Sequence, residues 1–237
     1  MAVPTLARSE PVEASTLAAR PVCPGHPAAG RLAKRAFDVA AALVLLALAM
    51  PLLAVLAVAL RLRCGSPVLF RQVRVTRGGR SAVIVKLRTL REHLDADTRW
   101  CVPAQGLTPL AQWLRDTHLD ELPQLINVLR GDMSLVGPRP ERPYFSELFS
   151  REIPGYASRH RMRAGLTGWA QVNGLTGDTS IAERIRFDNY YIDHWSLRFD
   201  LKILARTIGL VAQAVRGTGI PVPVSQQPAT QPGRWAA

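Results

Sequence analysis

The sequence predicts an α+β fold in a monotopic membrane protein, in which one long apolar helix is followed by a small mixed domain. Three observations predict this class. The segment over residues 39–60 carries no charge, two β-branched runs flank a pair of glycines after it, and a basic amphipathic pattern lies near the C-terminus. At 237 residues the chain is long enough for one such domain with a buried core.

The two ends of the chain, residues 1–30 and 218–237, are rich in alanine and proline and poor in large apolar side chains. Such segments bury too little surface to offset the entropy lost on ordering. We therefore expect a disordered N-terminal arm and a flexible tail. Between them we expect a membrane helix over 31–63 and a folded domain over 64–217.

The formal net charge is +12, and arginine supplies most of the positive charge, because the only lysines are Lys34, Lys86 and Lys202. Arginine forms planar, bidentate contacts with phosphate and carboxylate groups. This composition suits nucleic acid, an anionic membrane surface or a phosphorylated small molecule, and by itself leaves all three open. The three cysteines are far apart and lack metal-ligand spacing, as is typical of reduced thiols in the cytoplasm.

The uncharged stretch over residues 39–60 contains 22 residues. As a helix it measures about 33 Å, which is enough to cross a bilayer. Met50 and Pro51 lie near its middle, where the proline removes a backbone hydrogen bond and predicts a kink. Basic residues flank both ends, among them Arg31 and Arg61, which favours a re-entrant helix that returns to the cytoplasmic face. A kinked spanning helix and a buried helix of a soluble protein are the alternatives.

Two β-branched runs follow, separated by TRGGR, and predict a β-hairpin whose turn uses Gly78 and Gly79 in positive-φ conformations. In the second strand Lys86 and Arg88 are two residues apart and project from one face. This pattern fits an ordinary solvated face and a phosphate-binding pair equally well.

Near the C-terminus the segment DLKILARTIGLVAQAVRG predicts an amphipathic helix with basic residues away from its apolar stripe. Such a helix either packs on a core or lies in a membrane interface, and a neighbouring membrane helix favours the interface. The stripe consists of Leu201, Leu204, Ile208, Val211 and Val215.

The segment LDELPQLINVLRGDM places Asp120 and Glu121 just before Pro123, which suits a first helical turn, and Gly131 suits the helix end. Acids at this place commonly cap a helix and complement its dipole. Adjacent helical residues also point about 100° apart, so two acids there can serve separate purposes. One carboxylate could attack as a nucleophile while the other binds a hard cation such as Mg²⁺.

Two arginines extend this second interpretation. Arg115 lies five residues before Asp120, and Arg139 lies in GPRP, where flanking prolines restrict the backbone. A carboxylate nucleophile, a divalent cation and fixed arginines together suit phosphoryl transfer.

Several segments of the chain resemble the bacterial sugar transferases, which are monotopic polyprenyl-phosphate phosphoglycosyltransferases. These enzymes begin the assembly of exopolysaccharide, capsule, O-antigen or glycoprotein glycans. The resemblance runs from Lys34 to Ile208 with the motifs in family order, and it implies the short form that lacks additional N-terminal domains. It rests on KRAFDVAAALVLLALAMPLLAVLAVAL, FRQVR, KLRT, LRDTHLDELPQLINVLRGDMSLVGPRPE, GLTGWAQVNG and DNYYIDHWSLRFDLKIL.

The resemblance implies a role for each matching residue. Asp120 would attack the sugar-bearing phosphate of a UDP-sugar and release UMP, after which polyprenyl (undecaprenyl) phosphate takes the phosphosugar. Glu121 would bind Mg²⁺. Lys86, Arg88 and Arg115 match positions near the phosphates, and Arg139 matches a position that helps place the nucleotide. Met50 and Pro51 match the break in the membrane helix.

The resemblance also implies partners and a location. The partners are a UDP-sugar, polyprenyl phosphate and membrane lipid, and no nucleic acid is expected. A homodimer is compatible with the resemblance. The location is the bacterial inner (cytoplasmic) membrane. The protein would have interfacial amphipathic helices and a small catalytic domain that faces the cytoplasm. The chain departs from the family pattern at His118, where serine is usual, at Ala111, where glycine is usual, and at Ala164, where proline is usual.

Two other functions fit part of the sequence. A membrane-tethered basic adaptor would explain the arginines but would leave Asp120 and Glu121 as helix caps only. A lipid-linked phosphatase or hydrolase would use water in place of polyprenyl phosphate.

Overall fold

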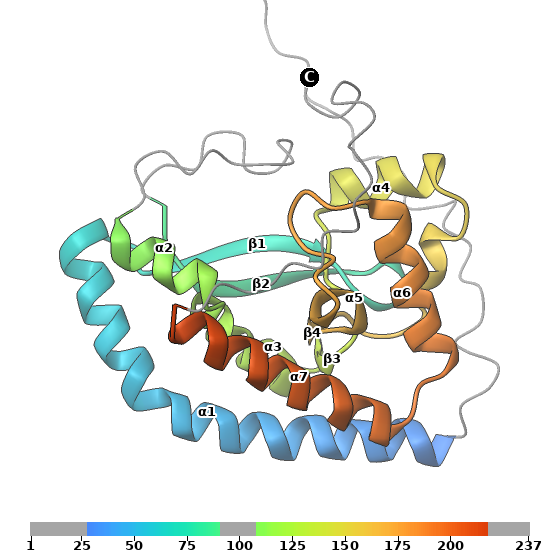
Figure 1. Cartoon of the computed structure of the whole chain (residues 1–237), viewed down its shortest axis with the longest axis horizontal. Helices are drawn as coiled ribbons and strands as arrows, with labels where there is room; N and C mark the ends of the chain where they lie inside the picture. The colour runs from blue at the N-terminus through green and yellow to red at the C-terminus, as the bar shows by residue number, and fades with distance from the viewer. Residues whose placement is uncertain (1–27, 91–107, 218–237) are drawn as a thin grey trace, which may run out of the picture.

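The computed structural model describes residues 28–90 and 108–217, so the expected arm and tail lie almost wholly outside the described residues. Helices and strands are mixed, and one long apolar helix comes first, which confirms the expected α+β class at this level. In Figure 1 the hairpin of β1 and β2 lies above α3 and α7, and α1 runs along the lower edge. The helices α4, α5 and α6 gather at one end of the molecule.

The first helix, α1 (Ala28–Cys64), is continuous through Pro51 and begins three residues before the expected membrane helix. Within the described residues it is the one helix long and apolar enough to cross a membrane, and only 11% of its most apolar window is buried. Leu48, Val55 and Leu62 are among its exposed side chains. Figure 1 shows that the second half of α1 turns toward β1 and α2 instead of continuing straight.

The polar first turns of α1 are anchored in the rest of the fold. Lys34 Nζ donates to Asp200 Oδ2 at 2.8 Å, and Ser134 Oγ donates to Asp38 Oδ2 at 2.8 Å. Both aspartates are almost fully buried, with 0–1% of their surface exposed. Arg35 donates to the last carbonyls of α3, a contact that also complements the negative end of that helix.

The hairpin is present as expected. β1 (Leu69–Val75) pairs antiparallel with β2 (Ser81–Leu87), and the 3₁₀ turn η1 (Arg77–Gly79) joins them. Gly78 and Gly79 have φ values of 68° and 75°, the left-handed region that glycine adopts without a steric cost. Asn127 ties the hairpin to the next layer, since its side-chain amide exchanges hydrogen bonds with the backbone of Val83 and Val85.

A second pair of strands, which is parallel, lies below the hairpin in Figure 1. β3 (Ser134–Val136) pairs with β4 (Gly165–Thr167), and the loop after β3 continues the pairing because Gly137 N donates to Thr167 O. The backbones approach so closely that a Cβ on Gly165 would lie 2.1 Å from Gly137 N. Glycine is therefore required at this crossing.

Short helices complete the domain around these strands. In chain order they are α2 (Pro109–Asp116), η2 (Leu119–Gln124), α3 (Leu125–Arg130), α4 (Pro143–Glu152), η3 (Tyr156–Arg161), α5 (Trp169–Val172), α6 (Ile181–Asp193) and α7 (Leu197–Val215).

The last helix, α7, begins at its cap Ser196, whose side chain accepts a hydrogen bond from Phe199 N. The core meets α7 at Asp200 and Ile203, whereas the predicted apolar stripe is largely exposed. Ile208, for example, has 70% of its surface exposed. Leu204 of this stripe packs against the core, whereas Leu201, Ile208 and Val215 are exposed, so core packing accounts for only part of the stripe.

Candidate active site

The two adjacent acids lie in the 3₁₀ turn η2 and are buried, with 4% of Asp120 and 9% of Glu121 exposed. Of the two interpretations of these acids, capping of the next helix does not hold, because neither acid occupies a cap position. The residues at the cap positions are His118 for η2 and Gln124 for α3, and Pro123 lies inside η2 instead of in the first turn of α3. The backbone at His118 is left-handed, with φ 56°, and η2 packs against β2.

Glu121 is held by a two-pronged contact. Arg139 donates from Nη2 to Oε1 at 2.6 Å and from Nη1 to Oε2 at 3.2 Å. Burial alone would raise the pKa of Glu121, but the charge and hydrogen bonds of Arg139 outweigh burial and lower that pKa to about 2. Glu121 therefore stays ionised through the whole physiological range.

Asp120 has different surroundings although it is the next residue in the chain. Within residues 28–90 and 108–217, no hydrogen bond or ion pair holds its side chain. Burial, and then the negative charge of Glu121, raise its pKa to about 6, against the opposing charges of Lys86, Arg139 and Arg115. The result is a carboxylate that is ionised at neutral pH and not committed to a partner in the described residues.

A pocket opens beside Glu121 and is lined by the hairpin on one side and by the GPRP loop on the other. Three cations and one acid line it, so its charge favours an anion. The ammonium of Lys86 lies 5.3 Å from the ring centre of Phe70, and burial lowers its pKa. The lining residues are Gln72, Arg74, Ile84, Lys86, Glu121, Gln124, Arg139 and Pro140.

The hairpin register explains why β1 contributes to this pocket. Phe70 pairs with Lys86 and Gln72 pairs with Ile84, so alternate residues of β1 point to the same side as Lys86. Neither Gln72 nor Arg74 was predicted from the sequence to have a role in the site. The period-two pattern of FRQVR, combined with the register, is the signal that could have found both.

The loop that carries Arg139 is fixed through its backbone. The carbonyl of Arg139 accepts a hydrogen bond from Arg159, and the carbonyl of Pro140 accepts one from Arg74. On the other side of the loop Gly165 N donates to Pro138 O. The side chain of Arg139 thus starts from a backbone that is held on both sides.

The other predicted phosphate-binding residues lie around the acids in different ways. Arg115, in the last turn of α2, is near enough for its charge to oppose the raised pKa of Asp120. Arg88 lies one residue beyond β2, where its backbone N–H donates to Val68 O at 2.7 Å. The pocket lining does not include Arg88 or Arg115, so their roles stay predictions.

The donor set suits a magnesium ion only in part. Among the described residues, no group of three or more His, Cys, Asp and Glu side chains could hold a metal by themselves. Mg²⁺ usually takes one or two carboxylates and completes its shell with water and substrate phosphate oxygens. Glu121, with Asp120 beside it, fits that kind of site, provided that one contact to Arg139 opens.

Residues 29–214 match the family model of the bacterial sugar transferases. The chain belongs to this family, which confirms the resemblance of its motifs. Its relatives include proteins named for the transfer of sugar phosphates to undecaprenyl phosphate, and the chain is an enzyme of that phosphoglycosyltransferase class. The long apolar helix α1 agrees with a membrane-associated member of the family.

Three relatives illustrate the range. A UDP-glucose:undecaprenyl-phosphate glucose-1-phosphate transferase of Caulobacter vibrioides is 47% identical over 200 residues, covering 81% of this chain and 74% of that protein. The Escherichia coli protein with the same name is 41% identical, covering 75% of this chain and 40% of its own length. An N-acetylgalactosaminephosphotransferase of Aeromonas hydrophila is 40% identical, covering 74% and 42%. The chain therefore corresponds to less than half of the two longer proteins.

Proposed function

We propose that this protein transfers a sugar-1-phosphate from a UDP-sugar to polyprenyl phosphate through a phosphosugar intermediate on Asp120. UMP is released, and the lipid-linked product begins the assembly of an exopolysaccharide, capsule, O-antigen or related glycan. The names of the relatives support the two substrates.

The observation that carries this proposal is the contrast between the two adjacent acids. Arg139 engages both oxygens of Glu121, whereas no partner among the described residues holds the carboxylate of Asp120. A nucleophile needs a free lone pair and an ionised state, and a pKa of about 6 leaves Asp120 ionised at neutral pH. Structural capping would not require burial of either acid.

The two steps balance without a proton transfer. In the first step an Asp120 carboxylate oxygen bonds to the phosphorus that carries the sugar, and the bond between this phosphorus and the bridging oxygen breaks. UMP leaves with that oxygen and its electron pair. In the second step an oxygen of polyprenyl phosphate bonds to the same phosphorus, and Asp120 leaves as a carboxylate.

Cationic side chains near Asp120 suit the phosphates of the donor. Lys86 and Arg139 line the pocket beside the acids, and the charges of Lys86, Arg139 and Arg115 all act on Asp120. Positive charge fixed in a partly dehydrated site stabilises the charge that develops on phosphoryl oxygens. We propose that Lys86 and Arg115 hold the diphosphate, with Arg88 at its margin, and that Arg139 orients the nucleotide side.

We propose that Mg²⁺ enters with the donor and is held by Glu121 and phosphate oxygens. A bound ion would neutralise part of the diphosphate charge. Because Glu121 is held by Arg139, the ion must compete for one carboxylate oxygen. Chelation of divalent cations should abolish UMP release, and Glu121→Gln should raise the Mg²⁺ concentration needed for half-maximal rate by about tenfold or more.

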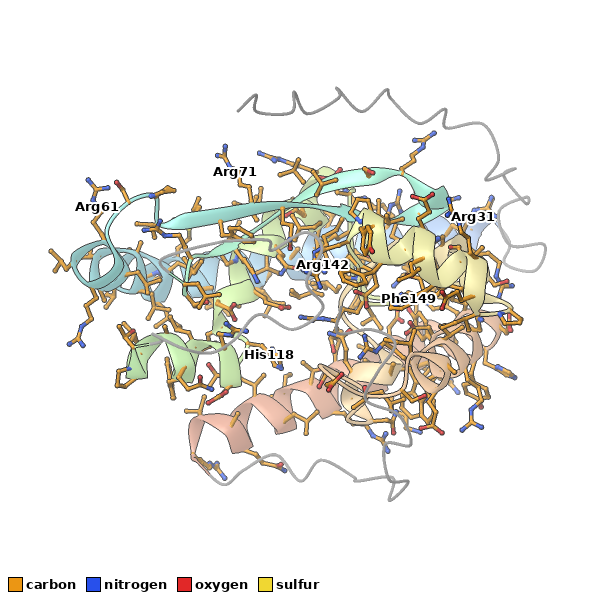
Figure 2. The ribbon with its side chains drawn as sticks, turned by 90° about the horizontal axis from the view of Figure 1, so that it is seen from above. Arg31, Arg61, Arg71, His118, Arg142 and Phe149 are labelled. Carbon is orange, nitrogen blue, oxygen red and sulfur yellow. The ribbon has the colours of Figure 1, made fainter. Side chains whose placement is uncertain are left out.

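We further propose that α1 is a re-entrant helix of the inner membrane and that the domain faces the cytoplasm. The apolar side chains that α1 leaves exposed support membrane insertion, and its change of direction in Figure 1 supports a return to the same side. The basic side chains Arg31 and Arg61, which lie near opposite ends of the molecule in Figure 2, suit the cytoplasmic headgroups at both ends of this helix. The exposed stripe of α7 suits the interface beside it.

The test is UMP release by the purified full chain with Mg²⁺, polyprenyl phosphate and a panel of UDP-sugars. Release with one sugar, lost in Asp120→Asn, is the expected result and would also identify the sugar. Free sugar phosphate formed without a lipid acceptor would instead indicate hydrolysis. Silence across the panel from folded protein would contradict the proposed reaction.

A further inference from the structure

Arg159, which is buried, and Arg74, which is partly buried, hold consecutive backbone carbonyls of the loop that carries Arg139. Arg159 Nη2 donates to the carbonyl of Arg139 at 2.9 Å, and Arg74 Nη1 donates to the carbonyl of Pro140 at 3.1 Å. Neither arginine contacts Asp120 or Glu121 in any hydrogen bond of the described residues. The two contacts nevertheless fix the peptide group from which the Arg139 side chain departs.

Arg159 is itself held by a carboxylate from a distant part of the chain. Its Nε and Nη2 donate to Asp188 Oδ2 at 3.1 and 2.7 Å, and its Nη1 donates to Tyr156 Oη at 3.2 Å. Only 2% of either Arg159 or Asp188 is exposed. The pair joins η3 to α6, and it is remote in sequence from the motif of the two acids.

Stability alone gives a weak reason for such a pair. Removing two charges from water is costly, and apolar residues of similar volume often serve stability equally well. A fully buried pair does, however, give one direction to each of its donors. Here Arg159 Nη2 donates both to Asp188 and to the carbonyl of Arg139. The pair with Asp188 therefore fixes the direction of this donor.

We propose that Arg159, held by Asp188, is a positioning residue that aims Arg139 at Glu121. The inference rests on the proposed function, because it assigns these residues to the geometry of the same site. The connection runs from Asp188 to Arg159, from Arg159 to the backbone of Arg139, and from the Arg139 guanidinium to both oxygens of Glu121. The prolines on each side of Arg139 limit other ways of setting this backbone.

Arg159→Lys is the main variant, since it keeps the charge but replaces the planar fork with a single ammonium. Lysine cannot hold Asp188 and the carbonyl of Arg139 with the same geometry. A displacement of about 1 Å at a reacting group costs about 100-fold in rate. We therefore expect a loss of about 10-fold to 100-fold in single-turnover UMP release, measured without a lipid acceptor.

The chain provides a matched control on the same two elements. Arg161 also lies on η3 and donates from Nη2 to Asp193 Oδ1 on α6 at 2.7 Å and from Nε to Ser158 O at 3.0 Å, but its pair with Asp193 is more exposed than that of Arg159 and Asp188. Arg161→Lys should leave the rate within about twofold of the wild type, as is usual for a surface pair. Equal losses in Arg159→Lys and Arg161→Lys would overturn the proposal.

Two readouts separate positioning from a general loss of structure. Because Arg139 is proposed to orient the nucleotide, its displacement in Arg159→Lys should raise the UDP-sugar concentration needed for half-maximal UMP release, whereas Arg161→Lys should leave that concentration unchanged. In an Arg139→Lys background, the same Arg159→Lys change should have little further effect on the rate. An unchanged dependence on UDP-sugar concentration, or fully additive rate losses, would overturn the proposal and leave only a structural role.

A structural readout keeps the inference separate from the reaction itself. The structure of Arg159→Lys should show the Arg139 fork moved away from Glu121, whereas that of Arg161→Lys should keep it. If Arg159→Lys does not fold, Arg159→Gln combined with Asp188→Asn removes both charges together and replaces it. A wild type that releases no UMP would refute the proposed function, and an intact Arg139–Glu121 fork in the variant would refute the positioning role.

Discussion

At the scale of single residues, two neighbouring acids differ because of one arginine. The guanidinium of Arg139 makes Glu121 a permanent anion, and that anion, together with burial, keeps the pKa of Asp120 high. Two carboxylates in one dehydrated site would otherwise share a proton. When the pH falls, the first proton that this pair of acids takes up therefore binds to Asp120, while Arg139 keeps Glu121 ionised.

The rate of the first step should report the ionisation of Asp120. In the proposed reaction only the ionised carboxylate of Asp120 attacks, so kcat/KM for UMP release should fall about tenfold for each pH unit below about 6 and level off above pH 7. The measurement is the burst of UMP without lipid acceptor, because the phosphate of the acceptor titrates in the same range. A burst that stays constant from pH 5 to pH 8 would contradict the assignment.

The same residue should cost stability. The pKa of Asp120 is raised in the fold, so the folded state binds this proton more tightly than the unfolded chain does, and stability is lost as pH rises from about 3.8 to about 6. A shift of about two units corresponds to about 3 kcal/mol. Asp120→Asn should therefore stabilise the protein by up to about 3 kcal/mol at pH 7.5 and by little at pH 4.

Unfolding of the wild type and of Asp120→Asn at these two pH values tests this expectation. Asp116→Asn is a suitable control, because Asp116 is exposed at the end of α2. A gain of equal size at both pH values would mean that ionisation of Asp120 is not the cause.

The residues of the site were predictable to different degrees. Asp120, Glu121, Lys86 and Arg139 stand in local motifs, and the structure brings all four into one region. Arg159 and Asp188 form a pair although they are 29 residues apart in the sequence. In a chain with many arginines, the sequence alone does not distinguish a buried arginine from a surface one. Burial and backbone contacts decide such roles, and neither is written in a single sequence.

At the scale of secondary-structure elements, local signals predicted position better than geometry. The glycine turn of the hairpin and the stop at Gly131, with φ 91°, were correct because both depend on backbone conformations of single residues. The start of α3 was wrong, because tertiary contact with β2 draws the acids into a separate 3₁₀ turn. The parallel pairing of β3 with β4 was not predicted, since three-residue strands leave no pattern.

Glycines at two positions should respond in opposite ways to alanine. A Cβ at Gly165 would meet backbone atoms of Gly137 and Thr167 at 2.1 to 2.6 Å, so Gly165→Ala should destabilise the domain by about 2–4 kcal/mol or prevent folding. Gly209 lies in α7 with open space around it, so Gly209→Ala should stabilise by about 0.5–1 kcal/mol. Thermal unfolding of both variants tests the pair, and equal effects would contradict the close crossing of β3 and β4.

At the scale of the whole molecule, apolar and charged surfaces are separated. The exposed leucines and valines concentrate on α1, with smaller sets on the hairpin and on α7, whereas Glu121, Lys86 and Arg139 line the pocket between the hairpin and the GPRP loop. In Figure 2, Arg61 and Arg71 project outward from the molecule and Arg142 lies toward its interior. The large net positive charge thus divides into a part that suits anionic headgroups and a part that suits a diphosphate.

The route of α1 can be tested in whole cells. With the native cysteines replaced, single cysteines at Ala29 and Ser66 should both escape a membrane-impermeant reagent applied from the periplasmic side. Pro51→Leu should restore one backbone hydrogen bond, straighten α1 and expose one of the two cysteines. If one of the two cysteines is labelled in the protein that keeps Pro51, the re-entrant route is contradicted and a spanning helix is indicated.

The junction of Lys34 with Asp200 has a practical consequence for work on this enzyme. The apolar segment cannot simply be removed, because its first turns supply Lys34, which donates to the buried Asp200, and Asp38, which accepts hydrogen bonds from Ser134 and Leu135. A chain shortened to begin after α1 would leave the buried charge of Asp200 without Lys34, at a cost of about 3–5 kcal/mol. Efforts to obtain a water-soluble fragment should therefore redesign the lipid-facing leucines of α1 and keep the helix itself.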